Sequence, residues 1–115
     1  MKQEMEIMLE KRDDIIILDM QGDCTTESEP FVKEAYEDAS NQGASKILLN
    51  FDEDAYINSG GLAILIQLLA EARQHNQTVA ITGLSKHFRK IFNMVGISKI
   101  ADIYITFEEA IEKLS

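Results

Sequence analysis

Hydrophobic and polar residues follow one another in short blocks along this chain, and the period of the pattern changes from block to block. Glu4–Glu10 alternates with a period of two, whereas Asp14–Gly22 has a continuous apolar centre at Ile15–Leu18. Alternation is typical of an edge strand, and a continuous apolar run is typical of a buried central strand. We therefore expect two strands joined by a polar turn at Lys11–Asp13. Three more short apolar runs predict further strands: Lys46–Phe51, Thr78–Gly83 and Asp102–Ile105.

Four other stretches repeat apolar residues at the spacing of an α-helix. The first follows the polar run Thr25–Ser28 and has Pro30 in its first turn, where proline is tolerated. The last opens with Thr106, which forms a possible capping box with Glu109. The positions that define the predicted helices are Phe31, Val32, Ala35, Tyr36 and Ala39 in the first, Leu62, Leu65, Ile66, Leu69 and Arg73 in the second, Phe88, Ile91 and Phe92 after Ser85 in the third, and Phe107 onward in the fourth.

The resulting element order, ββαβαβα(β)α, predicts right-handed crossovers and a mostly parallel sheet. We expect a single α/β domain over residues 1–115. Its mixed sheet would have four to five strands, with about four helices packed on it. A chain of 115 residues fits one domain and can bury about two-thirds of its unfolded surface without a metal or disulfide.

Composition narrows the range of functions. The formal net charge of −9 opposes binding to nucleic acid or to anionic membranes, and no apolar run reaches the length of about 20 residues needed to span a bilayer. The amino-terminal segment has no signal-peptide pattern, so we expect a cytoplasmic protein. Cys24 is the single cysteine; it is either a small packed side chain or a reactive thiol. The cysteine and histidines lack the spacing of a zinc site, and we expect no metal and no cofactor.

The segment Asn58-Ser59-Gly60-Gly61 stands at the entrance of the second predicted helix. Its simplest interpretation is a helix cap, because Asn and Ser both accept hydrogen bonds from the first turn. The preceding strand, however, brings Ser59 to the carboxyl edge of the sheet, where partners are commonly bound in α/β proteins. The two glycines would remove side chains around Ser59 and let a large partner reach the hydroxyl. A phosphate on Ser59 would be tolerated, because a helix N-terminus favours negative charge.

The second helix offers a further, weaker indication of binding. With Leu62, Leu65, Ile66 and Leu69 on the core-facing side, Ile64 and Leu68 point to one side. We expect Ile64 to pack against another helix. Leu68 is predicted to be an exposed anchor for a partner.

Catalysis by Ser59 is not expected, because a nucleophilic serine needs a base within hydrogen-bond reach. The segment lacks the leading glycine of a G-x-S-x-G turn. His75 lies about 24 Å along the helix at 1.5 Å per residue. His87 belongs to the basic segment SKHFRK, where a solvated side chain is expected.

The stretch YINSGGLAIL, from Tyr56 to Leu65, resembles the start of the long helix in STAS domains, and in particular in bacterial anti-sigma factor antagonists. The later stretch GLSKHFRKIFNMVGISKIADIYITFEEAI is similar to the closing helix, short strand and final helix of that family. Gly22 after the second strand fits as well. The similarity covers nearly the whole chain.

The resemblance implies a function for the helix entrance. In that family the serine is phosphorylated by the anti-sigma factor, a serine kinase of the histidine-kinase-like ATPase type. The unphosphorylated protein binds the kinase, and a metal-dependent serine/threonine phosphatase restores the binding form. By position, the phosphoacceptor would be Ser59. The expected partner-binding residues are Asn58, Gly60, Gly61, Leu68, Thr25 and Thr26.

Two positions depart from the antagonist pattern. Asn58 stands where aspartate is usual, and Thr25 stands where many members have a second aspartate. An alternative role therefore stays open, in which the chain is a subunit of another signalling or lipid-transport complex, or a ligand-sensing module, without a phosphoswitch.

Overall fold

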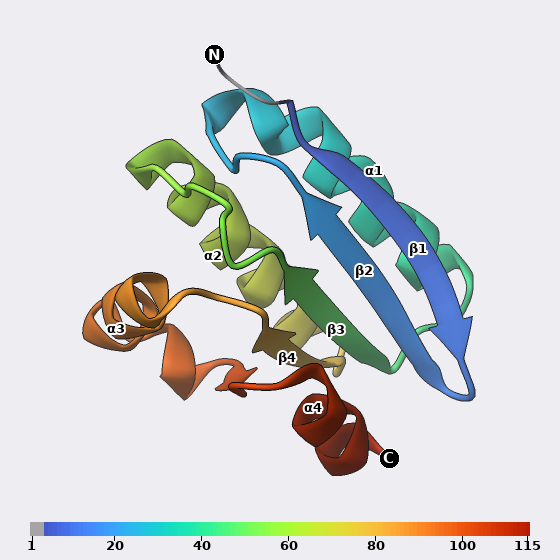
Figure 1. Cartoon of the computed structure of the whole chain (residues 1–115). Helices are drawn as coiled ribbons and strands as arrows, with labels where there is room; N and C mark the ends of the chain where they lie inside the picture. Colours follow the sequence, from blue (N-terminus) through green and yellow to red (C-terminus); the bar gives the residue numbers. More distant parts are fainter. Residues whose placement is uncertain (1–3) are drawn as a thin grey trace.

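The structure is a computed structural model that describes residues 4–115. Five strands form one sheet in the spatial order β1-β2-β3-β4-β5 (Figure 1). β1 pairs antiparallel with β2, and all other neighbours are parallel, as the element order predicts. The strands are β1 Glu6–Arg12, β2 Ile15–Gln21, β3 Lys46–Phe51, β4 Thr78–Thr82 and β5 Asp102–Ile103.

The hairpin between β1 and β2 is shifted from its predicted position. β1 continues to Arg12, which pairs with Ile15, so the turn lies at Asp13 and Asp14 and not at Lys11–Asp13. Asp13 takes a left-handed conformation with φ of 55°, which aspartate tolerates better than most residues. The polar character of Lys11 reflects its edge strand and not a turn.

Four α-helices were predicted, and four are present within residues 4–115. Side chains cap three of them: Asn58 bonds the Gly61 N–H, Ser85 bonds the Phe88 N–H, and Thr106 bonds the Glu109 N–H. Short 3-10 turns precede α1 and follow α3. The helices are α1 Glu29–Asn41, α2 Ser59–Gln74, α3 Lys86–Met94 and α4 Phe107–Leu114.

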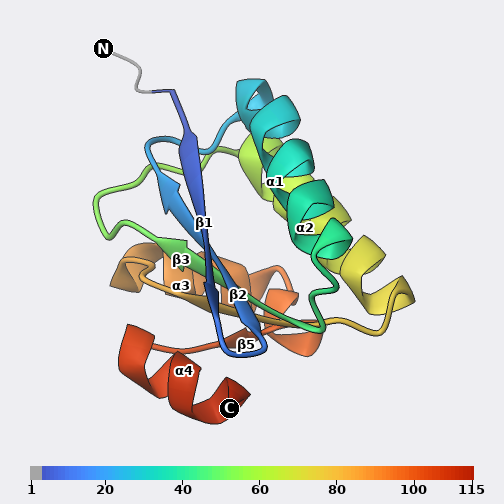
Figure 2. The same ribbon diagram turned by 90° about the vertical axis from the view of Figure 1, so that its right-hand side faces the viewer.

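The helices cover the two faces of the sheet unequally. Figure 2 shows α1 and α2 side by side on one face and α4 on the other. On β2, Ile16 and Leu18 belong to the main core under α1 and α2, whereas Ile15 and Ile17 pack in a smaller cluster with residues of α4. Burial on both faces explains why β2 is apolar without alternation.

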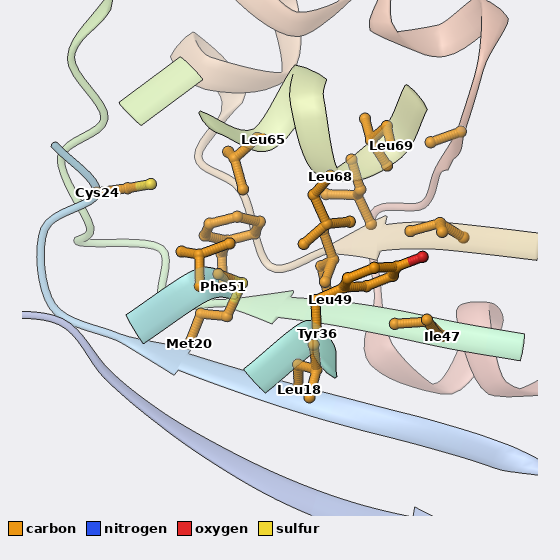
Figure 3. Packing of buried hydrophobic residues seen from close by; sticks show 14 of the residues in the cluster. Leu18, Met20, Cys24, Tyr36, Ile47, Leu49, Phe51, Leu65, Leu68 and Leu69 are labelled. Carbon is orange, nitrogen blue, oxygen red and sulfur yellow. The ribbon is translucent and has the colours of Figure 1, made fainter. Parts of the chain in front are cut away.

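The buried side of α2 differs from the predicted one. Leu68 is only 5% exposed and lies next to Tyr36 and Leu49 in the main core (Figure 3), so the prediction of an exposed anchor is wrong. Ile66, which was assigned to the core side, is 38% exposed. The cause is α1, which lies beside α2 and buries the flank that carries Leu68 and Ile64. The expected packing of Ile64 against another helix is confirmed.

Candidate functional site

Ser59 is the first residue of α2, and its side chain is exposed. Asn58 precedes it in an extended conformation, and its Oδ1 accepts a hydrogen bond from the Gly61 N–H at 2.8 Å. This is the geometry of an N-cap, which satisfies one free donor of the first turn. The sequence therefore predicted the local structure of the helix entrance, and the cap fixes the backbone that carries the Ser59 hydroxyl.

The entrance is held in place by a second loop, between β2 and α1. The Cys24 N–H donates to the Tyr56 carbonyl at 2.8 Å, and the Asn58 N–H donates to the Cys24 carbonyl at 3.1 Å. The carboxylate of Asp23 also accepts a hydrogen bond from the Tyr56 N–H at 3.3 Å. The two loops thus form a short parallel bridge at the carboxyl edge of the sheet, and Ser59 stands on a fixed backbone.

The two glycines make room for the chain's own loop. A Cβ on Gly60 would overlap the hydroxyl of Thr26, and a Cβ on Gly61 would overlap the carbonyl of Cys24. The sequence interpretation held that the glycines clear space for a partner. The structure gives a different reason for them, because the vacant side-chain positions are filled by Thr26 and Cys24. Direct contact of Gly60 and Gly61 with a partner stays a prediction.

The neighbouring threonines differ in accessibility. Thr25 is buried and caps the 3-10 turn Thr26–Ser28: its hydroxyl accepts from the Glu27 N–H, and its own N–H donates to the Ser28 hydroxyl at 2.9 Å. The side chain of Thr26 is exposed. Both threonines were predicted to contact a partner. Thr26 presents its side chain to solvent beside Gly60, whereas Thr25 has a structural role in the loop.

Exposed or partly buried apolar side chains lie on the same helix face as Ser59 or in the loop before it, and the sequence interpretation had not assigned them to binding. Ser59, Leu62 and Ile66 lie at spacings of three and four residues, so they share one face of α2. Tyr56 is 57% exposed and its ring meets Phe88 of α3 edge-on, with centroids 6.3 Å apart. We call these residues, together with Thr26, the entrance surface: Thr26, Tyr56, Ser59, Leu62, Ile66 and Phe88.

Acidic residues border the entrance surface at Tyr56. The Asp23 carboxylate accepts a hydrogen bond from the Tyr56 N–H. The acidic loop residues Asp52–Asp54 lie shortly before Tyr56 in the sequence. Lys86 and Lys90 are exposed on α3, but each is two residues from Phe88 and therefore lies on the other side of the helix. Arg89 is partly engaged, because its guanidinium donates to the Leu84 carbonyl at 2.9 Å.

The other side chains considered for reactivity are the two histidines and Cys24. His75 is the C-cap of α2, at the opposite end from Ser59, and its Nδ1 lies 3.2 Å from the Tyr36 hydroxyl. The His87 ring contacts Phe88. Burial raises the pKa of the Cys24 thiol to about 12, so it is protonated at neutral pH and is not the reactive thiol considered as an alternative. Over residues 4–115, no three Cys, His, Asp or Glu side chains gather as a metal site, and no helix is long and apolar enough to cross a bilayer.

Comparison with known proteins identifies relatives over nearly the whole chain. The family model for the STAS domain matches residues 6–110, which include the complete entrance surface. The anti-sigma-B factor antagonist of Listeria monocytogenes is 27% identical over 100 residues, or 86% of this chain and 88% of that protein.

Solved structures share the fold at lower sequence identity. An anti-sigma factor antagonist from Mycobacterium paratuberculosis has a TM-score of 0.81 at 14% identity, covering 96% of this chain and 93% of that chain. The Bacillus cell fate determinant SpoIIAA in its phosphorylated form has a TM-score of 0.68 at 18% identity, covering 96% of this chain and 100% of that chain.

Proposed function

Because this chain belongs to the STAS domain family, we propose that it is an anti-sigma factor antagonist switched by phosphorylation of Ser59. It would be a non-catalytic module that binds an anti-sigma factor serine kinase of the histidine-kinase-like ATPase type through the entrance surface. Phosphorylation would release the kinase, and a metal-dependent serine/threonine phosphatase would restore binding. The Listeria relative, named as an anti-sigma-B factor antagonist, and the phosphorylated SpoIIAA structure support this proposal.

The observation that carries the proposal is the position of Ser59. Its side chain is exposed at the first residue of a 16-residue helix, and the partly buried Leu62 and the exposed Ile66 continue from it along the same face. A phosphate there adds a charge of about −1.5 to −2 at a helix end that favours anions. The helix would stay folded, while an apolar partner surface docked on Leu62 and Ile66 would have to desolvate that charge.

The two departures from the antagonist pattern preserve the backbone. Asn58 caps Gly61, and the Thr25 hydroxyl caps the Glu27 N–H, which are hydrogen bonds that aspartate would also accept. What changes is charge, because neither residue places a carboxylate beside Ser59. A kinase that serves this chain would accordingly recognise an uncharged residue immediately before the acceptor.

The proposal is tested by incubating the protein with ATP and the histidine-kinase-like ATPase encoded beside it, then locating phosphate by mass spectrometry. Phosphate on Ser59, and none in Ser59→Ala, is expected. Ser59→Ala should bind the kinase permanently and Ser59→Asp should bind it poorly. If both variants bind the kinase as the natural protein does, the phosphoswitch is wrong.

The missing carboxylates favour one second candidate. With Asn58 and Thr25 uncharged, the same entrance surface could join a signalling or lipid-transport complex without phosphate transfer. Copurification with transporter subunits, and a protein that stays unmodified in the kinase experiment, would favour this role. Phosphorylated Ser59 would count against it.

A further inference from the structure

β1 is the outermost strand of the sheet and has a partner on one side only. Within residues 4–115, β2 is the single strand that pairs with it, and Figure 1 shows β1 at the margin of the sheet. A strand in this position presents a row of unpaired backbone N–H and C=O groups. The opposite edge strand, β5, has only two residues, whereas β1 has seven, and its register with β2 runs without a bulge from Glu6 to Arg12. β1 is therefore the longer of the two open edges.

The turn between β1 and β2 determines which backbone groups of β1 are free. Arg12 and Ile15 flank a two-residue turn, and residues in this position are hydrogen-bonded to each other. Bonded and non-bonded pairs alternate along an antiparallel ladder, so every second residue of β1, counted from Arg12, bonds to β2. The backbone groups of Ile7, Leu9 and Lys11 therefore point away from β2. Within residues 4–115, they bond to no backbone group of a loop or helix.

The composition of β1 does not prevent pairing with another strand. It contains neither proline nor glycine, and proline is one of the residues that natural edge strands use against pairing. Its two acidic residues, Glu6 and Glu10, are balanced by Lys11 and Arg12, so the charge of the strand is 2 − 2 = 0. The net charge of −9 belongs to the rest of the chain, and such charges are screened beyond about 8 Å at physiological ionic strength.

We propose that β1 is a self-association surface, on which β1 of a second copy pairs antiparallel about a two-fold axis through Leu9. This register uses all seven residues, and Glu6 lies opposite Arg12 of the second copy, twice by symmetry. Residues opposite each other must share a face, so the neighbouring registers are centred on Met8 or Glu10. They place Glu6 opposite Glu10, or Glu10 opposite itself, and like charges in that arrangement are destabilising. Length and charge thus select the same register.

The free backbone groups match in this register as well. Ile7 lies opposite Lys11 of the second copy and Leu9 lies opposite its own counterpart, so the three residues with free groups meet one another. Met8 is 68% exposed and lies diagonally across from Met8 of the second copy, within reach of a long side chain. Backbone hydrogen bonds thus supply the affinity, and side chains fix the register.

The Arg12 side chain can take up the new contact. Its Nη2 donates to the Glu10 carboxylate at 3.1 Å, and its Cζ lies 5.3 Å from the centre of the Phe107 ring. A guanidinium group has five N–H donors, so donors remain for Glu6 of a second copy.

The pairing leaves the helix entrance accessible. Ser59 follows β3, which β2 separates from β1, and strands lie about 4.8 Å apart. The two copies would therefore form one continuous sheet that carries two entrance surfaces. The proposal does not rest on the phosphorylation of Ser59.

The test is sedimentation velocity at rising concentrations up to about 1 mM, which populates even a weak pair. Glu6→Arg sets two arginines opposite each other, and Arg12→Glu sets two glutamates opposite each other. Each variant alone should self-associate about tenfold more weakly than the natural protein. An equimolar mixture of the two variants restores opposite charges at both positions, so it should associate within about threefold of the natural protein. This recovery also shows that both variants are folded.

The matched control is Glu53→Arg, in the exposed loop after β3, which changes the net charge as Glu6→Arg does. It should stay within about twofold of the natural protein, as for an isolated surface charge. Hydrogen exchange at the amides of Ile7, Leu9 and Lys11 should slow as the concentration rises. A natural protein that is monomeric at about 1 mM overturns the proposal. So does an equal loss in Glu53→Arg, a mixture that fails to associate, or association that leaves these three amides unprotected.

Discussion

The carbonyl group of Cys24 occupies the space into which a side chain on Gly61 would project. Gly61 lies in the first turn of α2, and Cys24 lies in the loop that follows β2, so this contact joins two segments far apart in the sequence. The hydrogen bond from the Asn58 N–H to the same carbonyl, at 3.1 Å, adds to it. The position of the Ser59 hydroxyl therefore depends on how closely the two loops approach.

Gly61→Ala is expected to destabilise the protein, although alanine is the better helix former by about 1 kcal/mol. The new methyl group would overlap a backbone carbonyl that is itself hydrogen-bonded, so the loop has to move. Overpacking of this kind costs about 1–3 kcal/mol. Urea unfolding followed by circular dichroism measures the free energy of unfolding directly.

Ser59→Ala is the matched control for Gly61→Ala, because it changes the same helix end at an exposed side chain. Its effect should stay within about 0.5 kcal/mol, as for surface substitutions. If Gly61→Ala were as stable as Ser59→Ala or more so, the close approach of Cys24 would not be rigid.

Local sequence signals predicted the strands, the helices and a cap at Asn58 or Ser59, because these depend on neighbours along the chain. They did not predict which flank of α2 is buried. That choice depends on α1, which covers Leu68 and leaves Ile66 in solvent. The sequence also did not reveal why residues 60 and 61 are glycines, because Thr26 and Cys24 come close to them only in the tertiary fold. Tyr56 could have been noticed as an aromatic residue in a polar loop, but its contact with Phe88 depends on where α3 packs.

Leu68→Ala should reduce stability and leave the entrance surface intact. The side chain is 5% exposed in the main core, and truncating a buried leucine costs about 2–5 kcal/mol. Ile66→Ala, at a more exposed position two residues away, should cost less than half as much. Chemical unfolding of the two variants side by side provides the measurement, and equal losses would contradict the burial assigned to Leu68.

The Cys24 thiol should resist alkylation by iodoacetamide at pH 8 until the protein unfolds. The side chain is 0% exposed, and its pKa of about 12 keeps the reactive thiolate scarce. Mass spectrometry after timed exposure, with and without urea, measures the modified fraction. Equal modification rates in the folded and unfolded protein would show that the loop between β2 and α1 opens readily.

The same raised pKa has a consequence for stability. The ordinary pKa of 9.0 applies to the unfolded chain, so above pH 9 the unfolded state loses its thiol proton while the folded state keeps it. This group's contribution to stability is therefore complete below pH 9 and falls as the pH rises toward 12. At pH 10, one pH unit above the pKa of the unfolded chain, the loss is on the order of 1 kcal/mol. Between pH 8 and 10, Cys24→Ala should lose correspondingly less stability than the natural protein.

If the proposed anti-sigma factor kinase docks on the entrance surface, Tyr56→Ala and Ile66→Ala should each weaken its binding by about tenfold or more, the loss seen when a hot-spot residue at the centre of an interface is truncated. Both side chains are exposed, so their truncation removes contact area without emptying the core. Met8→Ala is the matched control: Met8 is 68% exposed on β1, the edge strand farthest from β5, and should leave the affinity within twofold. Isothermal titration calorimetry with the purified kinase separates the three variants, and their melting temperatures show whether they are folded. Equal affinities for all three variants would place the kinase elsewhere on the molecule, because the entrance surface cannot then contribute its apolar contacts to binding.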